Sequence, residues 1–387
     1  MADTLLLKNV ILYSNINATK GTDILIRGGK IISVKASGEI PEPENFINAA
    51  GLIAVPGLID IHIHGAGGSD SLDGTGNALA NISRTLAQVG TTSFLSTMVV
   101  NPGGKNQHLK AATECTGKYL GGAELLGIYI EGPFINIEKR GGIVPESIAA
   151  PSSGILDEIL NETGDALKIM CVAPEIPGNE RIIRRLRDAG IVAAFGHSDA
   201  GYEETRKGFS MGINHVTHLF NAMRPLHHRE PGPLAAIFEE PGINTELIVD
   251  SHHVHPSLVR MAWKLRNKSE IACITDGISG MGLPEGTYTY NKKQYTSKDG
   301  LARYLDGTLI GSTMSLLNIV RNFIDFTGAG FKEAIDTVTV NPARILGIGN
   351  RKGSIQNGKD ADIVLIDPSF DVQYTIIAGN TVYRKKN

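Results

Sequence analysis

Short apolar runs alternate with amphipathic helical patterns through the middle of the chain. Residues 179–190, 257–267 and 315–326 carry apolar side chains at helical spacing. Such alternation is typical of strand–helix–strand units and a parallel sheet. Eight strand-like runs predict a TIM barrel, and a doubly wound sheet is the alternative, although no Gly-x-Gly-x-x-Gly segment follows the first run. The runs cover residues 58–64, 92–99, 124–130, 167–173, 191–197, 215–219, 245–249 and 270–275.

Both ends of the chain have a different pattern, that of short strands joined by tight turns. Residues 23–34 form two strand-like runs joined at Gly28-Gly29. Residues 360–367 and 374–383 read the same way, with a turn at Gly379-Asn380. Neither end has enough strands for a core, so we expect them to build one small β unit together. A segment rich in Tyr, Thr and Gly, residues 282–312, predicts a β-hairpin excursion before the last helix.

Composition excludes several classes of protein. The 387 residues are 42% hydrophobic and 20% charged, with a net charge of −3, which is ordinary for a globular protein and gives no basic excess for nucleic acid. No apolar run reaches the ~18 residues that span a bilayer, and the N-terminus is acidic where a signal peptide would be basic. The three cysteines, Cys115, Cys171 and Cys273, are expected to be buried free thiols, so we expect a cytoplasmic protein without membrane partners.

Ionisable residues follow most of the predicted barrel strands. Because the carboxyl ends of barrel strands face one mouth, where catalytic residues gather, these side chains are expected to meet there. Six of the eight runs are followed by such residues: His62 and His64, Glu131, His197, His218, His253 and Asp276.

A metal site is the first interpretation of this set. His62 and His64 are two apart on a strand and point to the same face, although an isolated His-x-His pair is a weak signal. Glu131, His197 and His218 offer the imidazole and carboxylate donors that zinc and related metals take, whereas single histidines are more often structural. Asp276 is either a helix cap or a base that takes a proton from the attacking water and returns it to a leaving amine.

The loop after the sixth run contains further polar residues. Asn221 and Arg229 could bind an anion there or could simply be solvated, and the residues alone leave both interpretations open.

These residues, in this order, resemble the amidohydrolase superfamily and, within it, the N-acetylglucosamine-6-phosphate deacetylase family. The resemblance covers nearly the whole chain. The His-x-His is shared by the superfamily, whereas the segments His218-Leu-Phe-Asn-Ala-Met223 and His228-Arg-Glu-Pro-Gly232 are specific to the deacetylases. The resemblance implies a TIM barrel of residues 58–346 and a small β-sandwich built from residues 1–57 and 347–387.

The resemblance also implies roles for individual residues. Glu131, His197 and His218 look like the metal ligands of the family, and His62 and His64 are similar to those of members that hold a second metal. Asp276 matches the proton-shuttling aspartate. The substrate would contact Asn221, the backbone at Ala222, Arg229, His253 and the stretch Leu309, Ile310 and Gly311.

Several further expectations follow from the resemblance. The cofactor is one or two divalent metal ions, with Zn²⁺ expected and Fe²⁺, Mn²⁺ or Co²⁺ as alternatives. The reaction is removal of the N-acetyl group from N-acetylglucosamine 6-phosphate, which gives glucosamine 6-phosphate and acetate. The chain is expected to be a homodimer, and the loop of residues 227–229 could reach the neighbouring subunit.

Two positions depart from the family pattern. Ile143 stands where many members have a histidine that polarises the acetyl carbonyl, and Ser251 stands where glycine is common. Losing one such donor typically costs ~10²–10³ in rate, so either a second metal takes over the polarising role or the substrate differs. The alternatives are therefore an amidohydrolase for another N-acetylated amino sugar or another amide, and a non-catalytic scaffold, against which the retained ligands argue.

Overall fold

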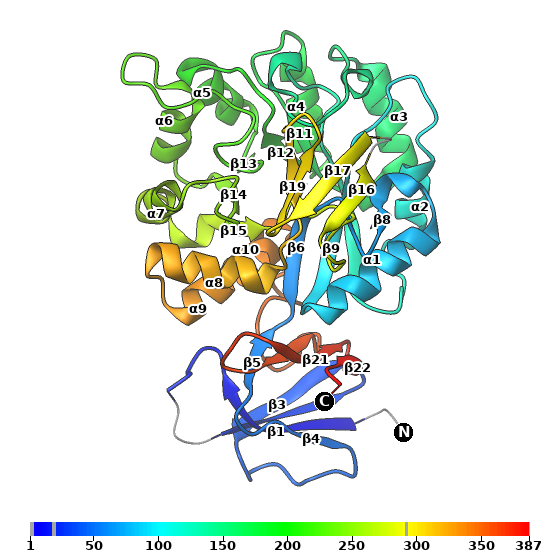
Figure 1. The fold of residues 1–387 in the computed structure, drawn as a ribbon, viewed down its shortest axis with the longest axis vertical. Coiled ribbons are helices and arrows are strands. Elements are labelled where there is room, and N and C mark those ends of the chain that lie inside the picture. The colour runs from blue at the N-terminus through cyan, green and yellow to red at the C-terminus, as the bar shows by residue number, and fades with distance from the viewer. Residues whose placement is uncertain (1–3, 18–20, 291–292, 387) are drawn as a thin grey trace.

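The computed structural model describes residues 4–17, 21–290 and 293–386. The larger part is a ring of strands surrounded by helices, and the smaller part is all β and contains both chain ends (Figure 1). The two parts are stacked along the long axis of the molecule. No helix among the described residues combines the length and apolar character needed to cross a membrane.

Eight parallel strands form the centre of the larger part. They pair in the order in which they occur in the chain, and their edges meet where the Asp276 amide donates to the His62 carbonyl at 3.0 Å and the His64 amide donates to the Gly277 carbonyl at 2.7 Å. This closure confirms the predicted TIM barrel and excludes an open doubly wound sheet. The strands are β6 (Leu58–Ile63), β9 (Thr91–Met98), β10 (Glu124–Ile130), β11 (Leu167–Val172), β12 (Val192–Phe195), β13 (His215–Val216), β14 (Asn244–Ile248) and β15 (Ile271–Ile274).

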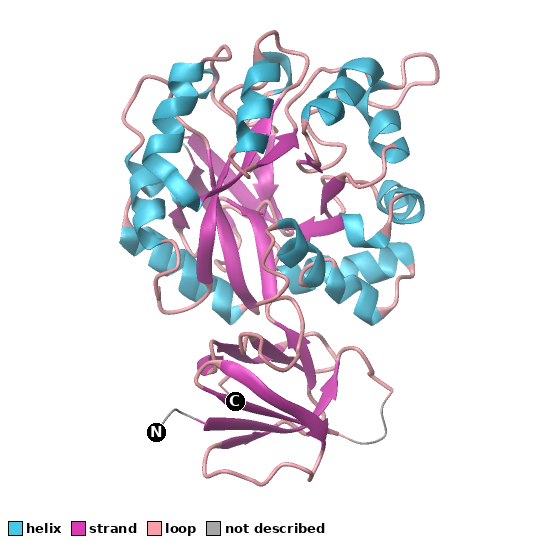
Figure 2. Cartoon of the chain, turned by 180° about the vertical axis from the view of Figure 1, so that it is seen from behind, coloured by secondary structure: helices cyan, strands magenta, loops and turns pink. Residues whose placement is uncertain are grey.

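Helices cover the outside of the barrel (Figure 2). They are α1 (Gly76–Gln88), α2 (Gln107–Cys115), α3 (Ser153–Thr163), α4 (Asn179–Asp188), α5 (Tyr202–Met211), α6 (Gly232–Glu239), α7 (Pro256–Leu265), α8 (Leu316–Thr327), α9 (Phe331–Asp336) and α10 (Val340–Ile345). The three helices expected from the sequence are α4, α7 and α8. Because helices pack on the outside and side chains fill the inside, the strands are buried on both faces, which explains their continuous apolar runs.

One barrel strand is shorter than its apolar run predicts. The run at residues 215–219 contributes only the two residues of β13 to the sheet. The backbone of His218 has a left-handed φ of 26°, which is incompatible with a continuing strand. The chain therefore leaves the sheet at the point where His218 enters the barrel mouth.

The small part joins strands from both ends of the chain, as expected. Its order is β22-β21-β20-β5-β1-β2-β3, with β4 paired to β1. The strands are β1 (Thr4–Leu12), β2 (Thr22–Arg27), β3 (Lys30–Ala36), β4 (Phe46–Asn48), β5 (Ile53–Pro56), β20 (Ile363–Ile366), β21 (Val372–Ile377) and β22 (Asn380–Arg384). The division into residues 1–57 with 347–387 and residues 58–346 stays our proposal, and this pairing supports it.

The excursion after the eighth barrel strand is larger than the predicted single hairpin. It forms an antiparallel sheet of β16 (Gly286–Tyr290), β17 (Lys293–Lys298), β18 (Leu301–Tyr304) and β19 (Leu309–Ser312). A second reversal is made at Asp299-Gly300, where both residues have a positive φ that a tight turn requires. It also precedes three helices, α8 to α10, rather than one. Figure 1 shows this sheet beside the barrel mouth.

Candidate metal centre

The barrel mouth gathers the ionisable residues that follow its strands. His62 is the fifth residue of β6, and Glu131 directly follows β10. His197, His218 and Asp276 each come two residues after the end of a strand and have left-handed backbones, with φ of 47°, 26° and 48°. Non-glycine residues adopt this conformation at a cost of about 1–3 kcal/mol, and such strain is concentrated at functional sites. These strained turns therefore end the strands at the barrel mouth, where the side chains of the three residues meet.

Glu131, His197 and His218 form the first group of donor atoms. Oε1 of Glu131 lies 2.8 Å from Nε2 of His197 and 3.0 Å from Nε2 of His218. The two imidazole Nε2 atoms are 3.1 Å apart. Three donors that converge on one small volume, all of them buried, suit a cation.

His62, His64 and Asp276 form the second group. Oδ1 of Asp276 lies 3.3 Å from Nε2 of His64 and 3.5 Å from Nε2 of His62. Glu131 lies between the groups, since its Oε1 is 3.7 Å from Nε2 of His62 and its Oε2 is 3.5 Å from Nε2 of His64. One carboxylate therefore faces both sets of imidazoles, which is the arrangement of a bridging ligand.

The free donor atoms of this centre fit a divalent metal. Nε2 of His62 is buried without a hydrogen-bond partner. Nδ1 of His197 lies 2.8 Å from the Lys139 carbonyl, to which it donates, so its Nε2 keeps a free lone pair. Buried polar atoms rarely lack a partner, and imidazole with carboxylate is the donor set that zinc, iron, manganese and cobalt accept. The residues present therefore fit the metal that the family implies.

The electrostatics of the centre also call for positive charge. Burial alone would raise the pKa of Glu131, but the neighbouring His197 and His218 hold it well below its usual value. Burial alone would lower the pKa of His62, but Glu246, Asp276 and Glu131 together raise it to about 10. Several ionised carboxylates thus surround a space that a cation would neutralise.

A cavity of about 210 Å³ opens onto this centre. Most of the predicted site residues line the cavity, whereas His62 is buried beneath it. Arg229 lies outside the cavity and is exposed, with its guanidinium 2.7 Å from Nε2 of His228. The predicted residues in the lining are His64, Glu131, His197, His218, Asn221, Ala222, His253, Asp276, Leu309, Ile310 and Gly311. The structure therefore brings together every predicted site residue except Arg229.

One departure from the family pattern lies in this cavity, and the other lies two residues before His253, which also lines it. Ile143 is part of the lining and offers no hydrogen bond. Ser251 adopts a φ of 72°, a left-handed conformation in which glycine would be unstrained. The Asp250–Ser251–His252 turn is fixed by the Asp250 carboxylate, which accepts from the His252 amide at 2.9 Å and from the His253 amide at 2.8 Å. These bonds hold His253 towards the cavity.

Gly311 is needed where the excursion sheet meets the barrel. Its φ is 142°, and a Cβ atom there would lie 2.6 Å from the Asp276 carbonyl oxygen. The Ser312 amide next to it donates to that same oxygen at 2.9 Å. This close approach places the backbone of β19 against the turn that carries Asp276.

Four residues or segments of the site were missed in the sequence. Tyr290 and the pair Gly141-Gly142 line the cavity, Asp250 orients His253, and Glu246 lies beneath the metal-ligand groups. A signal was available for Glu246, because it is a charged residue inside the apolar run 245–249. No such signal was available for Tyr290, because it belongs to a half-exposed strand whose pattern of apolar and polar residues does not show which side chains face the cavity.

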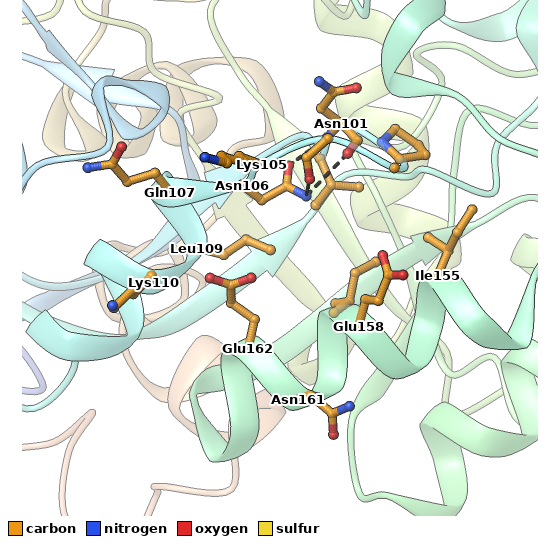
Figure 3. Close-up of a pocket in the computed structure, with 15 residues that line it drawn as sticks. Asn101, Lys105, Asn106, Gln107, Leu109, Lys110, Ile155, Glu158, Asn161 and Glu162 are labelled. Atoms are coloured by element: carbon orange, nitrogen blue, oxygen red, sulfur yellow. Dashed lines mark hydrogen bonds between the residues drawn. The ribbon is translucent and has the colours of Figure 1, made fainter.

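A larger hollow lies elsewhere, between the β9–α2 loop and α3 (Figure 3). Its volume is about 840 Å³, and its lining includes Lys105, Lys110, Glu158 and Glu162 but no histidine or cysteine. The one hydrogen-bonded cluster in view joins Asn101 and Asn106 within the loop. We therefore place the chemistry of the chain in the smaller cavity.

Comparison with known proteins agrees with the geometry. The model of the Amidohydrolase family matches residues 53–382. The chain is 36% identical to the N-acetylglucosamine-6-phosphate deacetylase of Bacillus subtilis (strain 168) over 100% of this chain and 99% of that protein. It is 33% identical to the N-acetylgalactosamine-6-phosphate deacetylase of Escherichia coli O157:H7 over 88% of this chain and 90% of that protein.

A solved structure gives the same result for the fold. The crystal structure of the N-acetylglucosamine-6-phosphate deacetylase from Pasteurella multocida superposes with a TM-score of 0.92 and 26% identity, and the match covers 99% of this chain and 100% of that one. The family is metal-dependent, and this chain has the donor groups for a metal. The chain therefore belongs to the N-acetylglucosamine-6-phosphate deacetylase family of the amidohydrolase superfamily, as its sequence predicted.

Proposed function

We propose that this chain is a metal-dependent hydrolase that converts N-acetylglucosamine 6-phosphate into glucosamine 6-phosphate and acetate. The observation that carries the proposal is the pair of donor groups around Glu131, with Asp276 beside them, at the floor of a cavity lined by four histidines, His64, His197, His218 and His253. The complete donor set supports a working enzyme rather than a non-catalytic scaffold.

The proposed cofactor is Zn²⁺, with two ions per chain. Glu131, His197 and His218 would hold one ion, and His62 and His64 the other, with the Glu131 carboxylate facing both and Asp276 beside the second. When bound, the metal would lower the pKa of a water molecule towards neutrality and polarise the acetyl carbonyl. A second ion would also replace the hydrogen bond that Ile143 cannot donate.

Asp276 is the proposed proton shuttle. Its carboxylate lies in the cavity lining, between the histidines of the second group and His253. Burial opposes the charge of Asp276, but the histidines around it lower its pKa, so the group is ionised and ready to accept a proton at neutral pH. Asp276 accepts the proton of the attacking water and passes it to the amine as the C–N bond breaks.

The substrate contacts are proposed at the open side of the cavity. Asn221, the backbone at Ala222 and Arg229 would bind the phosphate, since a guanidinium matches phosphate geometry. His253 and the backbone of residues 309–311 would contact the sugar. Because Arg229 is exposed beyond the lining, this role requires its loop to close on the ligand or to reach the site of a partner subunit. We accordingly propose a homodimer, which light scattering would test.

A substrate panel tests the proposal. We expect acetate release from N-acetylglucosamine 6-phosphate, activity that is lost with a chelator and restored by Zn²⁺, and little turnover of unphosphorylated N-acetylglucosamine. The second candidate substrate is N-acetylgalactosamine 6-phosphate, which the relative from Escherichia coli supports, together with the departure from the family pattern at Ile143 in the cavity lining. A higher kcat/KM for that isomer would reassign the substrate, and no release from either sugar phosphate would overturn the proposal. A cytoplasmic location is proposed from the three unpaired cysteines and is testable by fractionation.

A further inference from the structure

Glu246 contacts elements of both metal-ligand groups although it belongs to neither. It lies on β14, and its side chain is fully buried. Oε2 of Glu246 is 2.9 Å from Nδ1 of His62 and accepts a hydrogen bond from the His218 backbone amide at 3.0 Å. Oε1 lies 2.8 Å from Nε2 of His215. One carboxylate thus touches a ligand of the second group and the backbone of a ligand of the first.

Glu246 stands in a place where charge is costly. Its carboxylate has no solvent contact, and its partners are the His62 and His215 rings and the backbone amide of His218. An ionised carboxylate without solvent is tolerated only where its partners satisfy it, and each of its oxygens has such a partner here. A well-packed apolar residue at this position would avoid that cost, so the anion is expected to have a function.

For His62, the contact decides which nitrogen can ligate a metal. Because the Glu246 anion only accepts, the proton of His62 sits on Nδ1, and Nε2 keeps its lone pair. That Nε2 atom is the buried one without a partner. A carboxylate that accepts a hydrogen bond from the other ring nitrogen of a ligating imidazole fixes the tautomer and orientation of the ring and raises its basicity as a ligand.

For His218, the contact supports a strained backbone. The His218 φ of 26° is unfavourable, and the hydrogen bond from the His218 backbone N–H to the Glu246 carboxylate is one of the constraints that hold this conformation. The Leu219 amide donates to the Glu246 carbonyl at 2.9 Å, so the next residue is anchored to β14 as well. The position of the His218 imidazole in the first group therefore depends on where the Glu246 carboxylate lies.

We propose that Glu246 is a positioning residue that couples the two groups, so that a metal ion bound by one group favours binding of an ion by the other. An ion that draws on Nε2 of His62 strengthens the bond from Nδ1 to Glu246, and this fixes the carboxylate that holds His218. The inference rests on the two metal sites of the proposed function. It does not depend on the identity of the substrate.

Calorimetric titration of the chelator-stripped chain with Zn²⁺ tests the coupling. We expect two ions to bind the native protein, and Glu246→Gln to bind the second ion about 10–100-fold more weakly. Glu246→Asp keeps the charge but has a shorter side chain, and it should also weaken binding of the second ion. It replaces Glu246→Gln in the test if that variant does not fold. Asp250→Asn is the matched control. Oδ2 of Asp250 lies 2.6 Å from Nδ1 of His253, and His253 belongs to neither metal-ligand group.

Three results would overturn the inference. The first is binding of only one ion per native chain. The second is wild-type affinity for both ions in Glu246→Gln. The third is an equal loss of affinity at both sites together with a lower melting temperature of the metal-free variant, because that result indicates only a structural role. The deacetylase assay of the native protein is read separately. An inactive but normally coupled protein would contradict the proposed substrate and leave the coupling standing.

Discussion

Nε2 of His253 lies 3.9 Å from Oδ2 of Asp276, while Oδ1 of the same carboxylate lies 3.3 Å from Nε2 of His64. The two oxygens of Asp276 therefore face different neighbours, a metal-ligand group on one side and a cavity histidine on the other. Nδ1 of His253 is held 2.6 Å from Oδ2 of Asp250, which fixes the orientation of its ring. A group that carries a proton from the attacking water to the amine needs access to both sides.

This placement predicts a kinetic effect for Asp276→Asn. The substitution keeps the size of the side chain and removes the base, so kcat should fall by about 10²–10⁴. The variant should retain most of its metal, because Glu131, His197 and His218 are unchanged. KM should change little, since the proposed phosphate contacts lie elsewhere. Steady-state kinetics and metal analysis of the same preparation check these expectations.

Two outcomes would correct the assignment of Asp276. A near-normal kcat would show that it is not the shuttle. Loss of a full equivalent of metal would show that its main role is that of a ligand in the group with His62 and His64.

The double variant His62→Asn, His64→Asn tests the second metal. Removing both imidazoles leaves only Asp276 in that group, so the metal content should fall by about one ion per chain. The kcat should fall as well, because Ile143 supplies no donor for the acetyl carbonyl. His255→Asn, at the exposed N-cap histidine of α7 outside both groups, is the control. An unchanged metal stoichiometry would contradict the two-metal proposal.

The barrel and most of its site could be predicted from the sequence for one physical reason. Strands that are buried on both faces leave continuous apolar runs, and the residue after each run marks the barrel mouth. That is how Glu131, His197 and Asp276 were found without any contact information. Candidate ligand positions were thus visible as departures from an apolar pattern.

The features that were missed depend on contacts between distant segments. The role of Glu246 follows from its place next to His62 and His215, which come from other strands. The excursion was underestimated because its strands are half exposed, so residues 286–298 carry no apolar run that marks separate strands. The end of β13 at Val216 is set by the backbone of His218, which a hydrophobic pattern does not report.

Arg229→Ala tests the phosphate contact. A lost charge-assisted hydrogen bond costs about 1.5–3 kcal/mol, so KM for the phosphorylated sugar should rise roughly 10–100-fold with a smaller change in kcat. Arg303→Ala, on the exposed face of the excursion sheet, is the control. Because Arg229 is exposed, its removal should not lower the melting temperature. If KM for the phosphorylated sugar stays unchanged, the phosphate is bound by other residues.

The last prediction concerns the junction of the two parts, where Lys352 is surrounded by carboxylates. Its Nζ lies 2.8 Å from Oε2 of Glu124 on β10 and 3.4 Å from Oδ2 of Asp360, and it also bonds Asp362. These acids could hold a cation, but the ammonium group of Lys352 already lies among them. The cluster therefore joins the barrel to the strands of the chain end through charge.

The pKa shifts of this cluster set the sign of its pH dependence. Burial would raise the pKa of Glu124, but Lys352 and Arg351 lower it below its usual value. Burial would lower the pKa of Lys352, but Asp362 and Glu124 raise it. The contribution of Glu124 is therefore complete above the usual pKa of a glutamate and is lost as the pH falls through its lowered pKa. That of Lys352 is complete below the usual pKa of a lysine and is lost as the pH rises through its raised pKa.

Glu124→Gln should accordingly destabilise the protein in a pH-dependent way. At pH 7 we expect a loss of about 1–3 kcal/mol, less than for a fully buried pair because Glu124 is partly exposed and Lys352 keeps two other carboxylates. The loss should shrink as the pH falls below about 4.5, where an unfolded glutamate becomes protonated. Glu42→Gln, which breaks the exposed pair with Lys8, should change stability much less, because solvent screens that pair. Thermal melts of the native protein, Glu124→Gln and Glu42→Gln across the pH range measure these losses of stability. A loss in Glu124→Gln that is the same at every pH would mean that packing, not charge, holds the junction.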